Sequence, residues 1–288
     1  MMRARESPHC VMVPPTELRI LYHILWIIVL SGDSVASDHI PLSESLKRSV
    51  DSFLKEQDLL FWYQNYSWDA DTKNSNFKNI VNLEVEVIDA AKQNTVSCAQ
   101  IMQIARWGAH PMIDKIQCRE LVDVPIYDGD HLAAWVIEDP AEGLRTIRPQ
   151  VKYVGPTYMT KILRFALPSE FGALDTRITR VFGLGDPAHS YIRLLDLEAY
   201  DTGRKWFIKY PQPAWPGEYS KFIFILRYMV QKINRQGVRC PHPQILYDRG
   251  IRTPGVWECA DVEMALFSCA SERIYPRMSV SKGCGGKT

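Results

Sequence analysis

The stretch from Val151 to Gly183 constrains the fold of this 288-residue chain more than any other. Within it, apolar residues recur at the spacing of one helical face, at Tyr158, Met159, Ile162, Leu163 and Ala166. Gly155-Pro156 precedes this face and is typical of a turn into a helix, because proline suits the first helical turn. Asp175 predicts the start of a second helix, since an N-cap aspartate accepts hydrogen bonds from the first backbone N–H groups. We therefore expect two short helices, the first entered through a tight hairpin.

The same stretch is locally basic. Thr157, Lys161 and Arg164 share the polar face of the first helix at i, i+4 and i+7. Residues 145 to 180 include seven Lys or Arg and two Asp or Glu, whereas the formal net charge of the whole chain is only +1. A nucleic-acid surface must then come from local clustering, and hairpin N–H groups can add a phosphate contact that reads no base. Solvated surface is the alternative interpretation of such a charged run.

This segment resembles the helix-hairpin-helix DNA glycosylase superfamily and, within it, the members that act on 8-oxoguanine. In those proteins a hairpin ending in Val-Gly precedes a helix, and an essential aspartate follows at the start of another helix. Val154-Gly155 and Asp175, which lies twenty residues after Gly155, match that layout. The close resemblance covers the 33 residues from Val151 to Gly183.

The resemblance implies a mainly α, two-lobed helical fold and an enzyme that excises a damaged purine from double-stranded DNA, as a monomer with no cofactor and no metal ion. Asp175 would stabilise positive charge on the sugar. Lys161, with its pKa lowered by Arg164 and partial burial, would attack C1′ and form an imine that permits strand cleavage. The DNA-binding residues implied are Lys152, Tyr153, Val154, Gly155, Thr157, Arg164 and Arg177.

Three departures from the family pattern bear on this hypothesis. The family's lysine stands two residues after the hairpin glycine, where this chain has Thr157, and Lys161 lies one turn further along. Without that lysine the pattern resembles members in which the aspartate alone supports attack by water. Tyr153 replaces the first hairpin glycine, and the cysteine cluster that binds an iron–sulfur centre in some relatives is absent.

Two other classes of function stay open. One is a non-catalytic nucleic-acid-binding or scaffold protein of the same fold. The other is a secreted or membrane-tethered protein in which the hairpin match is accidental. The sequence contains no G-x-S-x-G elbow, Walker loop, H-E-x-x-H motif or Rossmann fingerprint, so other enzyme classes find little support.

The N-terminal segment, residues 1–37, is set apart by the apolar run from Ile20 to Leu30. Eleven residues are too few to span a bilayer as a helix. The run fits the apolar region of a signal peptide, with Val35-Ala36-Ser37 as a cleavage site, and equally a chain whose true start lies further on. The location is accordingly cytoplasmic or nuclear (or at a nucleoid), or else secreted or anchored through residues 20–30.

The remaining chain predicts a helical domain over residues 38–278 and a loose tail over 279–288. Further helices are expected near residues 43–54, 85–91, 99–107, 219–233 and 260–270. Asp201-Thr202-Gly203 predicts the turn of a small β-hairpin, and a soft boundary between lobes is expected at 140–148.

The seven cysteines are scattered and lack C-x-x-C spacing, which predicts mostly reduced thiols. Cys240-Pro241-His242 places two potential ligands together, but with no second pair nearby we expect no metal site. Trp62, Trp107 and Trp257 are candidates for stacking on a base, with core packing as the alternative.

Overall fold

The computed structural model describes residues 40–67 and 78–276. The chain divides into a unit ending at Ile40 and a unit running from Pro41 to Thr288, and the elements below belong to the second. The apolar run from Ile20 to Leu30 and the tail at 279–288 lie outside the described residues. Within the described ranges, no helix combines the length and apolar character needed to cross a membrane.

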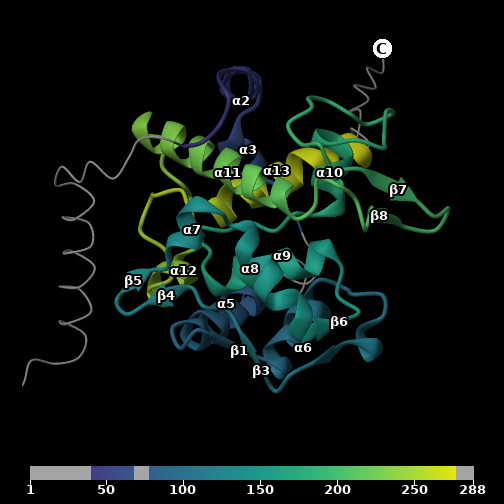
Figure 1. Cartoon of the computed structure of the whole chain (residues 1–288). Coiled ribbons are helices and arrows are strands. Elements are labelled where there is room, and N and C mark those ends of the chain that lie inside the picture. Colours follow the sequence, from purple (N-terminus) through teal and green to yellow (C-terminus); the bar gives the residue numbers. More distant parts are fainter. Residues whose placement is uncertain (1–39, 68–77, 277–288) are drawn as a thin grey trace, which may run out of the picture. The chain divides into compact units, whose positions relative to one another are not determined.

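Helices dominate these residues, which confirms the mainly α expectation (Figure 1). The α-helices are α2 (Glu44–Glu56), α3 (Leu59–Gln64), α5 (Lys78–Ala91), α6 (Cys98–Trp107), α7 (Ala134–Glu138), α8 (Ala141–Ile147), α9 (Pro156–Ala166), α10 (Thr176–Phe182), α11 (Gly217–Arg235), α12 (Gln244–Asp248) and α13 (Cys259–Ile274). Short 3-10 turns cover Ile113–Lys115 and Arg148–Gln150.

The strands are short and pair only in antiparallel twos. The pairs are β1 (Thr95–Ser97) with β3 (Leu121–Asp123), β2 (Gln117–Cys118) with β6 (Val151–Lys152), β4 (Tyr127–Asp128) with β5 (His131–Leu132), and β7 (Ala199–Asp201) with β8 (Trp206–Ile208). The β7–β8 pair confirms the expected hairpin, and Gly203 in its turn has φ +78°, a conformation that favours glycine.

Two groups of helices make up this unit (Figure 1). In one group α13 contacts α3, α10 and α11, while in the other α9 contacts α5, α6 and α8. The contact between α11 and α8 joins the groups, and α12 contacts α5. The stretch 140–148, expected to form a boundary, is mostly helix α8, which contacts α7 and α9 as well as α11 of the other group.

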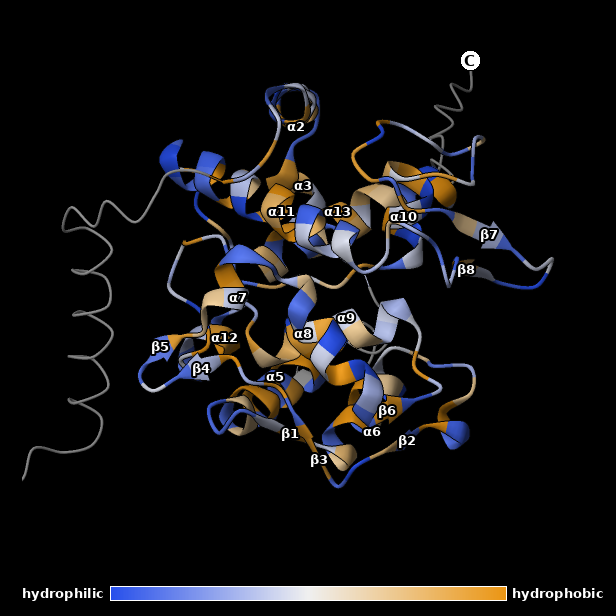
Figure 2. Ribbon diagram, in the orientation of Figure 1, coloured by the Kyte–Doolittle hydropathy of each residue, from blue (hydrophilic) through white to orange (hydrophobic). Residues whose placement is uncertain are grey.

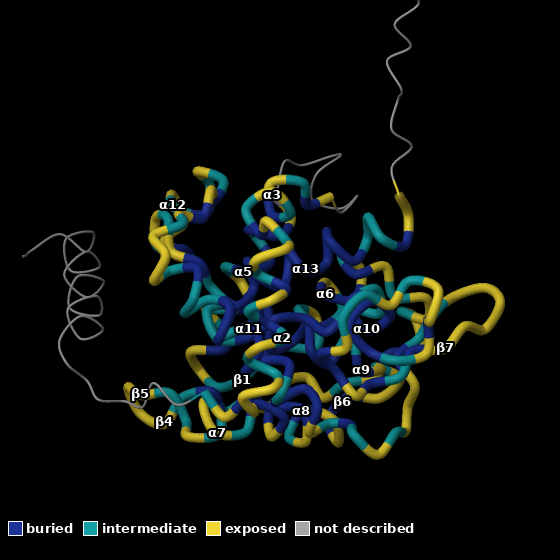
Figure 3. Tube along the Cα trace, turned by 90° about the horizontal axis from the view of Figure 1, so that it is seen from above, coloured by how far each residue is buried: buried dark blue, intermediate teal, exposed yellow. Residues whose placement is uncertain are grey.

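Helices α9 and α13 run through the interior and are buried along most of their length (Figure 3). The apolar faces of the surrounding helices turn towards them (Figure 2). A helix enclosed on all sides must bury its polar residues as well as its apolar ones. As a result Lys161 and Arg164 of α9, and Asp261 and Glu263 of α13, lie inside the protein.

Local capping sets several helix ends where the sequence predicts them. Ser43 accepts a hydrogen bond from the Leu46 N–H and begins α2. Ser97 and Gln100 form a capping box at the start of α6. Gly237, with φ +71°, follows the end of α11.

Cys98 and Cys118 form a disulfide with Cα atoms 5.6 Å apart. This corrects the expectation of mostly reduced thiols for these two residues, which only the pairing of distant segments brings together. Cys240, Cys259 and Cys269 are buried thiols outside any disulfide.

Candidate active site

Lys161 lies inside the protein on α9, with only 6% of its surface exposed. Its Nζ is 4.9 Å from the ring centroid of Trp107 and 5.1 Å from that of Tyr158, distances at which the rings attract a cation. Gly108 faces the amine closely, because a Cβ built there would be 2.9 Å from Nζ. The amine is therefore enclosed by two aromatic rings and a glycine that leaves it room.

Burial lowers the pKa of Lys161, since an ammonium loses hydration in the interior. The negative charges of Asp175 and Glu263 oppose this shift, and the positive charges of Arg164 and Arg177 add to it. The sequence predicted that Arg164 and partial burial together lower the pKa of Lys161. Of these two causes, burial has the larger effect on the pKa. A lowered pKa raises the fraction of neutral amine, which is the nucleophilic form.

Asp175 is the N-cap of α10, as the sequence predicts, and its carboxylate accepts a hydrogen bond of 2.9 Å from the Arg177 N–H. The preceding linker is tied to α9, because the Leu174 N–H donates to Thr160 Oγ1 at 3.0 Å. Asp175 interacts electrostatically with both Lys161 and Tyr158. The two residues predicted to be catalytic thus share one neighbourhood, although they lie on successive helices.

Glu263 of α13 joins this neighbourhood, although no pattern in the sequence pointed to it. Burial raises the pKa of its carboxyl to about 7, while Arg164 and Lys161 act to lower it. Arg164 Nε lies 3.7 Å from Oε2, and the backbone of Ala173 hydrogen-bonds to the carboxyl group. On the sequence Glu263 looks like one polar residue in a mostly apolar helix, so only the packing of α13 against α9 reveals it.

The loop after α6 supplies two further groups. The Tyr158 hydroxyl donates to the Gly108 carbonyl oxygen at 2.7 Å, and the His110 ring stands 4.3 Å from the Tyr158 ring. Burial and the positive charge of Lys161 lower the pKa of His110. This contact joins residues about fifty positions apart, so periodicity gave no signal for it.

The hairpin before α9 is accessible. Lys152, Tyr153 and Gly155 are exposed, while Val154 and Thr157 are partly buried. Tyr153 adopts φ +63°, the left-handed conformation that glycine takes most readily. This tyrosine therefore occupies a backbone conformation that favours glycine.

Pairing of β2 with β6 brings a further cation beside the hairpin. The Arg119 N–H donates to the Gln150 carbonyl oxygen at 3.2 Å, and the side chains of Arg119, Arg148 and Lys152 are exposed. Arg119 follows β2 and is distant from the hairpin in sequence, so the sequence analysis missed it. Exposed cations of this kind can contact phosphates.

The basic residues of α9 that were expected to form a stripe on the protein surface are buried. Arg164 is 1% exposed and forms a buried ion pair with Glu84, so the assignment of Arg164 to DNA binding is wrong. Lys161 is likewise buried, and Arg180 pairs with Asp186 in the interior. Helical spacing placed Lys161 and Arg164 on one face of α9, but other elements cover that face.

Arg177 is partly buried and lies beside a cavity of about 380 Å³. Its guanidinium donates to Ser271 Oγ at 2.9 Å and stands 4.8 Å from the Phe267 ring centroid. Aromatic and polar side chains line the cavity: Phe61, Trp62, Asn65, Ser67, Arg177, Ser268, Ser271, Glu272 and Tyr275. Trp62 thus faces a cavity, Trp107 faces Lys161, and Trp257 is core at 1% exposed.

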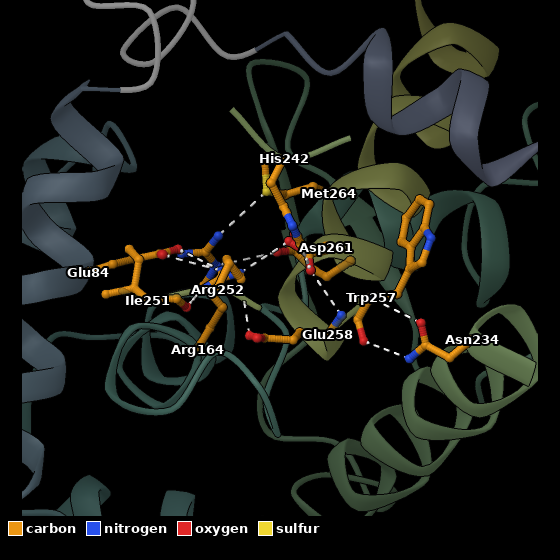
Figure 4. Close-up of polar contacts among 11 residues, drawn as sticks. Glu84, Arg164, Asn234, His242, Ile251, Arg252, Trp257, Glu258, Asp261 and Met264 are labelled. Atoms are coloured by element: carbon orange, nitrogen blue, oxygen red, sulfur yellow. Dashed lines mark hydrogen bonds and ion pairs between the residues drawn. The ribbon is translucent and has the colours of Figure 1, made fainter. Parts of the chain in front are cut away.

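A second buried cluster lies where the segment after α11 meets the start of α13. Arg252 stands between Glu84 and Asp261, and His242 contacts Asp261 from another side (Figure 4). Cys240, His242 and Asp261 each offer a ligand atom within 4.8 Å of the others.

The chain was compared with protein-family models, with curated proteins and with solved structures, and none of the three comparisons finds a match.

Proposed function

We propose that this protein is a DNA glycosylase of the helix-hairpin-helix kind, which excises a damaged purine such as 8-oxoguanine from double-stranded DNA. The observation that carries the proposal is the buried amine of Lys161, with its lowered pKa, beside the N-cap carboxylate of Asp175. The exposed hairpin at 152–155 and two groups of helices agree with the two-lobed fold that the resemblance implies.

The chemistry assigns one role to each of these groups. Neutral Lys161 Nζ attacks C1′ as the bond to the base breaks, and the base leaves with the bonding electrons and takes up a proton. Asp175 stabilises the positive charge that develops on the sugar. Loss of the amine proton and opening of the sugar ring give an imine, from which β-elimination breaks the bond to the 3′ phosphate. Glu263, with its pKa near 7, is suited to exchange protons in this neighbourhood at neutral pH.

The cavity beside Arg177 is the candidate site for the extruded base. Its volume of about 380 Å³ falls in the range of small-molecule pockets. Phe61, Trp62 and Tyr275 offer aromatic surfaces for stacking, and Arg177 with Asn65 offers groups that read polar edges. Arg177 also contributes to the lowered pKa of Lys161 through its positive charge.

One observation favours a second version of the reaction. Lys161 is only 6% exposed and does not line the cavity, so its attack on a sugar requires Tyr158 or the loop at Gly108 to move. If these residues stay in place, Asp175 supports attack by water, and the product is an abasic site without strand cleavage.

Borohydride trapping of the purified full chain with an 8-oxoguanine duplex tests the proposal. We expect a covalent adduct that is lost in Lys161→Ala and retained in Lys92→Ala, a control lysine that pairs with Asp89 at the surface. Asp175→Asn should keep the helix cap and lose at least tenfold in rate. Base release without an adduct would select the water reaction.

Absence of both adduct and base release, over a panel of damaged purines, would overturn the proposal. In that case a salt-dependent affinity for duplex DNA that is weakened by Lys152→Ala would indicate the non-catalytic nucleic-acid-binding protein. Without DNA affinity, both interpretations fail.

A further inference from the structure

Three side chains with different donor atoms meet at the start of α13. Cys240 and His242 lie in the segment after α11, and Asp261 lies in the first turn of α13. A sulfur, an imidazole nitrogen and a carboxylate oxygen from them lie within 4.8 Å of one another. The exposed fractions are 2%, 6% and 0%, so water has little access to these donors. The sequence shows only the first two as neighbours, and the packing of α13 adds the third.

The hydrogen bonding here is incomplete. His242 Nε2 lies 2.8 Å from Asp261 Oδ2, but His242 Nδ1 is buried with no hydrogen-bond partner among the described residues. Tyr63 lies beside the cluster: it hydrogen-bonds to Cys240, and its ring stands 6.0 Å from the His242 ring. Buried polar atoms in folded proteins are normally satisfied, so the buried Nδ1 of His242 is unusual and leaves the imidazole with unused capacity for a ligand.

The charges around the cluster leave room for a cation. Arg252 Nε is 3.3 Å from Asp261 Oδ1, and its positive charge opposes the binding of a metal ion there. Arg252 also lies 3.3 Å from Glu84 and 3.4 Å from Glu258, so two further carboxyl groups face its guanidinium. Asp261 and a Cys240 thiolate therefore supply the negative charge that a divalent ion needs.

We propose that Cys240, His242 and Asp261 bind a Zn²⁺ ion. Sulfur, imidazole nitrogen and carboxylate oxygen are the three donor types that zinc accepts, and sites with three protein ligands leave a fourth position for water. Ligand atoms around tetrahedral zinc lie roughly 3.3 to 3.8 Å apart, so closure of this cluster needs side-chain shifts of about 1 Å. Binding displaces the thiol proton to solvent and converts Cys240 into a thiolate ligand.

The ion would act as a structural link. It would join the segment after α11 to the start of α13, the helix that carries Glu263 and several residues of the cavity. The alternative without metal is a His242–Asp261 hydrogen bond beside a packed thiol. The two differ in metal content and in the chemical state of Cys240.

Elemental analysis and native mass spectrometry of the full chain distinguish them. The background protein for this experiment is the full chain with Cys10→Ser and Cys284→Ser. These two changes prevent thiols outside the described residues from binding the metal. We expect one zinc per chain after exposure to Zn²⁺ and dialysis, and at least tenfold weaker retention in Cys240→Ser. Cys259→Ser is the matched control, because Cys259 is a buried thiol in the first turn of α13 that is not in the cluster.

A spectroscopic measurement keeps the test valid if Cys240→Ser fails to fold. Replacement of Zn²⁺ by Co²⁺ in the background protein should give a thiolate-to-metal charge-transfer band. Chelation should abolish this band and lower the melting temperature, and Zn²⁺ should restore that temperature. No retained metal and no charge-transfer band in the folded background protein would overturn the proposal, as would full zinc retention in folded Cys240→Ser.

Discussion

Tyr153 has a backbone conformation that is strained for a residue with a bulky side chain. Its φ of +63° places a bulky side chain in the left-handed region, at a cost of about 1–2 kcal/mol, while its ring is 57% exposed and gains little from packing. Observed strain of this kind supports a functional role for the exposed side chain.

We expect Tyr153→Gly to be more stable than Tyr153→Ala by about 1 kcal/mol, because glycine removes the strain and alanine keeps it. Urea unfolding of the two variants measures the difference. If the ring contacts DNA, both variants should also bind duplex DNA less tightly than the parent protein. Equal stability of the two variants would show that the hairpin does not hold this conformation in solution.

Gly108 provides the space beside Lys161. A Cβ at this position would lie 2.7 Å from Tyr158 Cε1 and 2.9 Å from Lys161 Nζ, so Gly108→Ala must displace both side chains. We expect a loss of about 1–3 kcal/mol in the free energy of unfolding. We also expect at least a tenfold loss in the rate of borohydride trapping by the folded variant. Gly217→Ala is the control, since a Cβ there meets nothing within 4 Å. A normal trapping rate in Gly108→Ala would contradict this placement of the amine.

Glu263 should make stability fall as pH rises. The pKa of its carboxyl is about 7 in the folded protein and 4.5 as an ordinary value, so between these pH values the folded state holds a proton that the unfolded state releases. This group thus contributes no penalty at low pH and a penalty of up to about 3 kcal/mol above pH 7. Lys161, with its lowered pKa, has the opposite trend at higher pH.

Glu263→Gln should therefore gain stability relative to the parent protein from pH 5 to pH 8, by up to about 3 kcal/mol. Denaturant unfolding at both pH values measures this change, and the exposed Glu86→Gln is the control. Loss of a partner for Arg164 lowers the stability of the variant at both pH values, so the difference between them is the informative quantity. The same difference for both variants would reject a raised pKa at Glu263.

At the scale of elements, the helices that begin or end with a clear cap could be predicted from the sequence. Ser43, Asp175 and Gly237 act through hydrogen bonds and backbone angles within a few residues, so local patterns contain the necessary information. The fate of the polar face of α9 could not be predicted in this way. Whether Arg164 meets solvent or Glu84 depends on α5, which is distant in sequence.

The residues of the candidate site are also of two kinds, those that local sequence patterns identify and those that only tertiary packing brings in. Lys161 and Asp175 belong to one continuous segment, and their shared neighbourhood follows from the short linker between α9 and α10. Glu263, His110 and Arg119 come from separate elements and reach the site or the hairpin only through tertiary packing. Sequence patterns identify the first kind of residue, and the second kind needs the fold.

The ion pair between Arg164 and Glu84 fixes α9 against α5. Both side chains are nearly inaccessible, at 1% and 2% exposed, so removing one leaves the other charged and buried. We expect Arg164→Met to lower the free energy of unfolding by about 3–5 kcal/mol. The double variant with Arg164→Met and Glu84→Gln should lose less free energy of unfolding than the sum of the losses in the two single variants. Arg252 also loses one of its partners when Glu84 is replaced. Additive losses in chemical denaturation would show that the two groups do not interact.

At the scale of the whole molecule, the disulfide between Cys98 and Cys118 links two segments that precede α9 in the chain. It connects the start of α6 to β2, and β2 pairs with β6 beside the exposed hairpin. One covalent link and one strand pair thus hold the loop of Gly108 and the hairpin on the same group of helices.

Reduction of this disulfide should lower the free energy of unfolding by about 3 kcal/mol, because residues 20 positions apart no longer close a loop in the unfolded chain. Urea unfolding with and without a thiol-free reductant measures the change, and Cys98→Ser combined with Cys118→Ser should reproduce it without reductant. Since Cys240 is not part of this bond, neither treatment should release metal from a site at Cys240. A loss of stability on reduction that persists in the double variant would assign the effect to another cysteine. Unchanged stability in both experiments would instead mean that strand pairing and packing hold β2 in place without the covalent link.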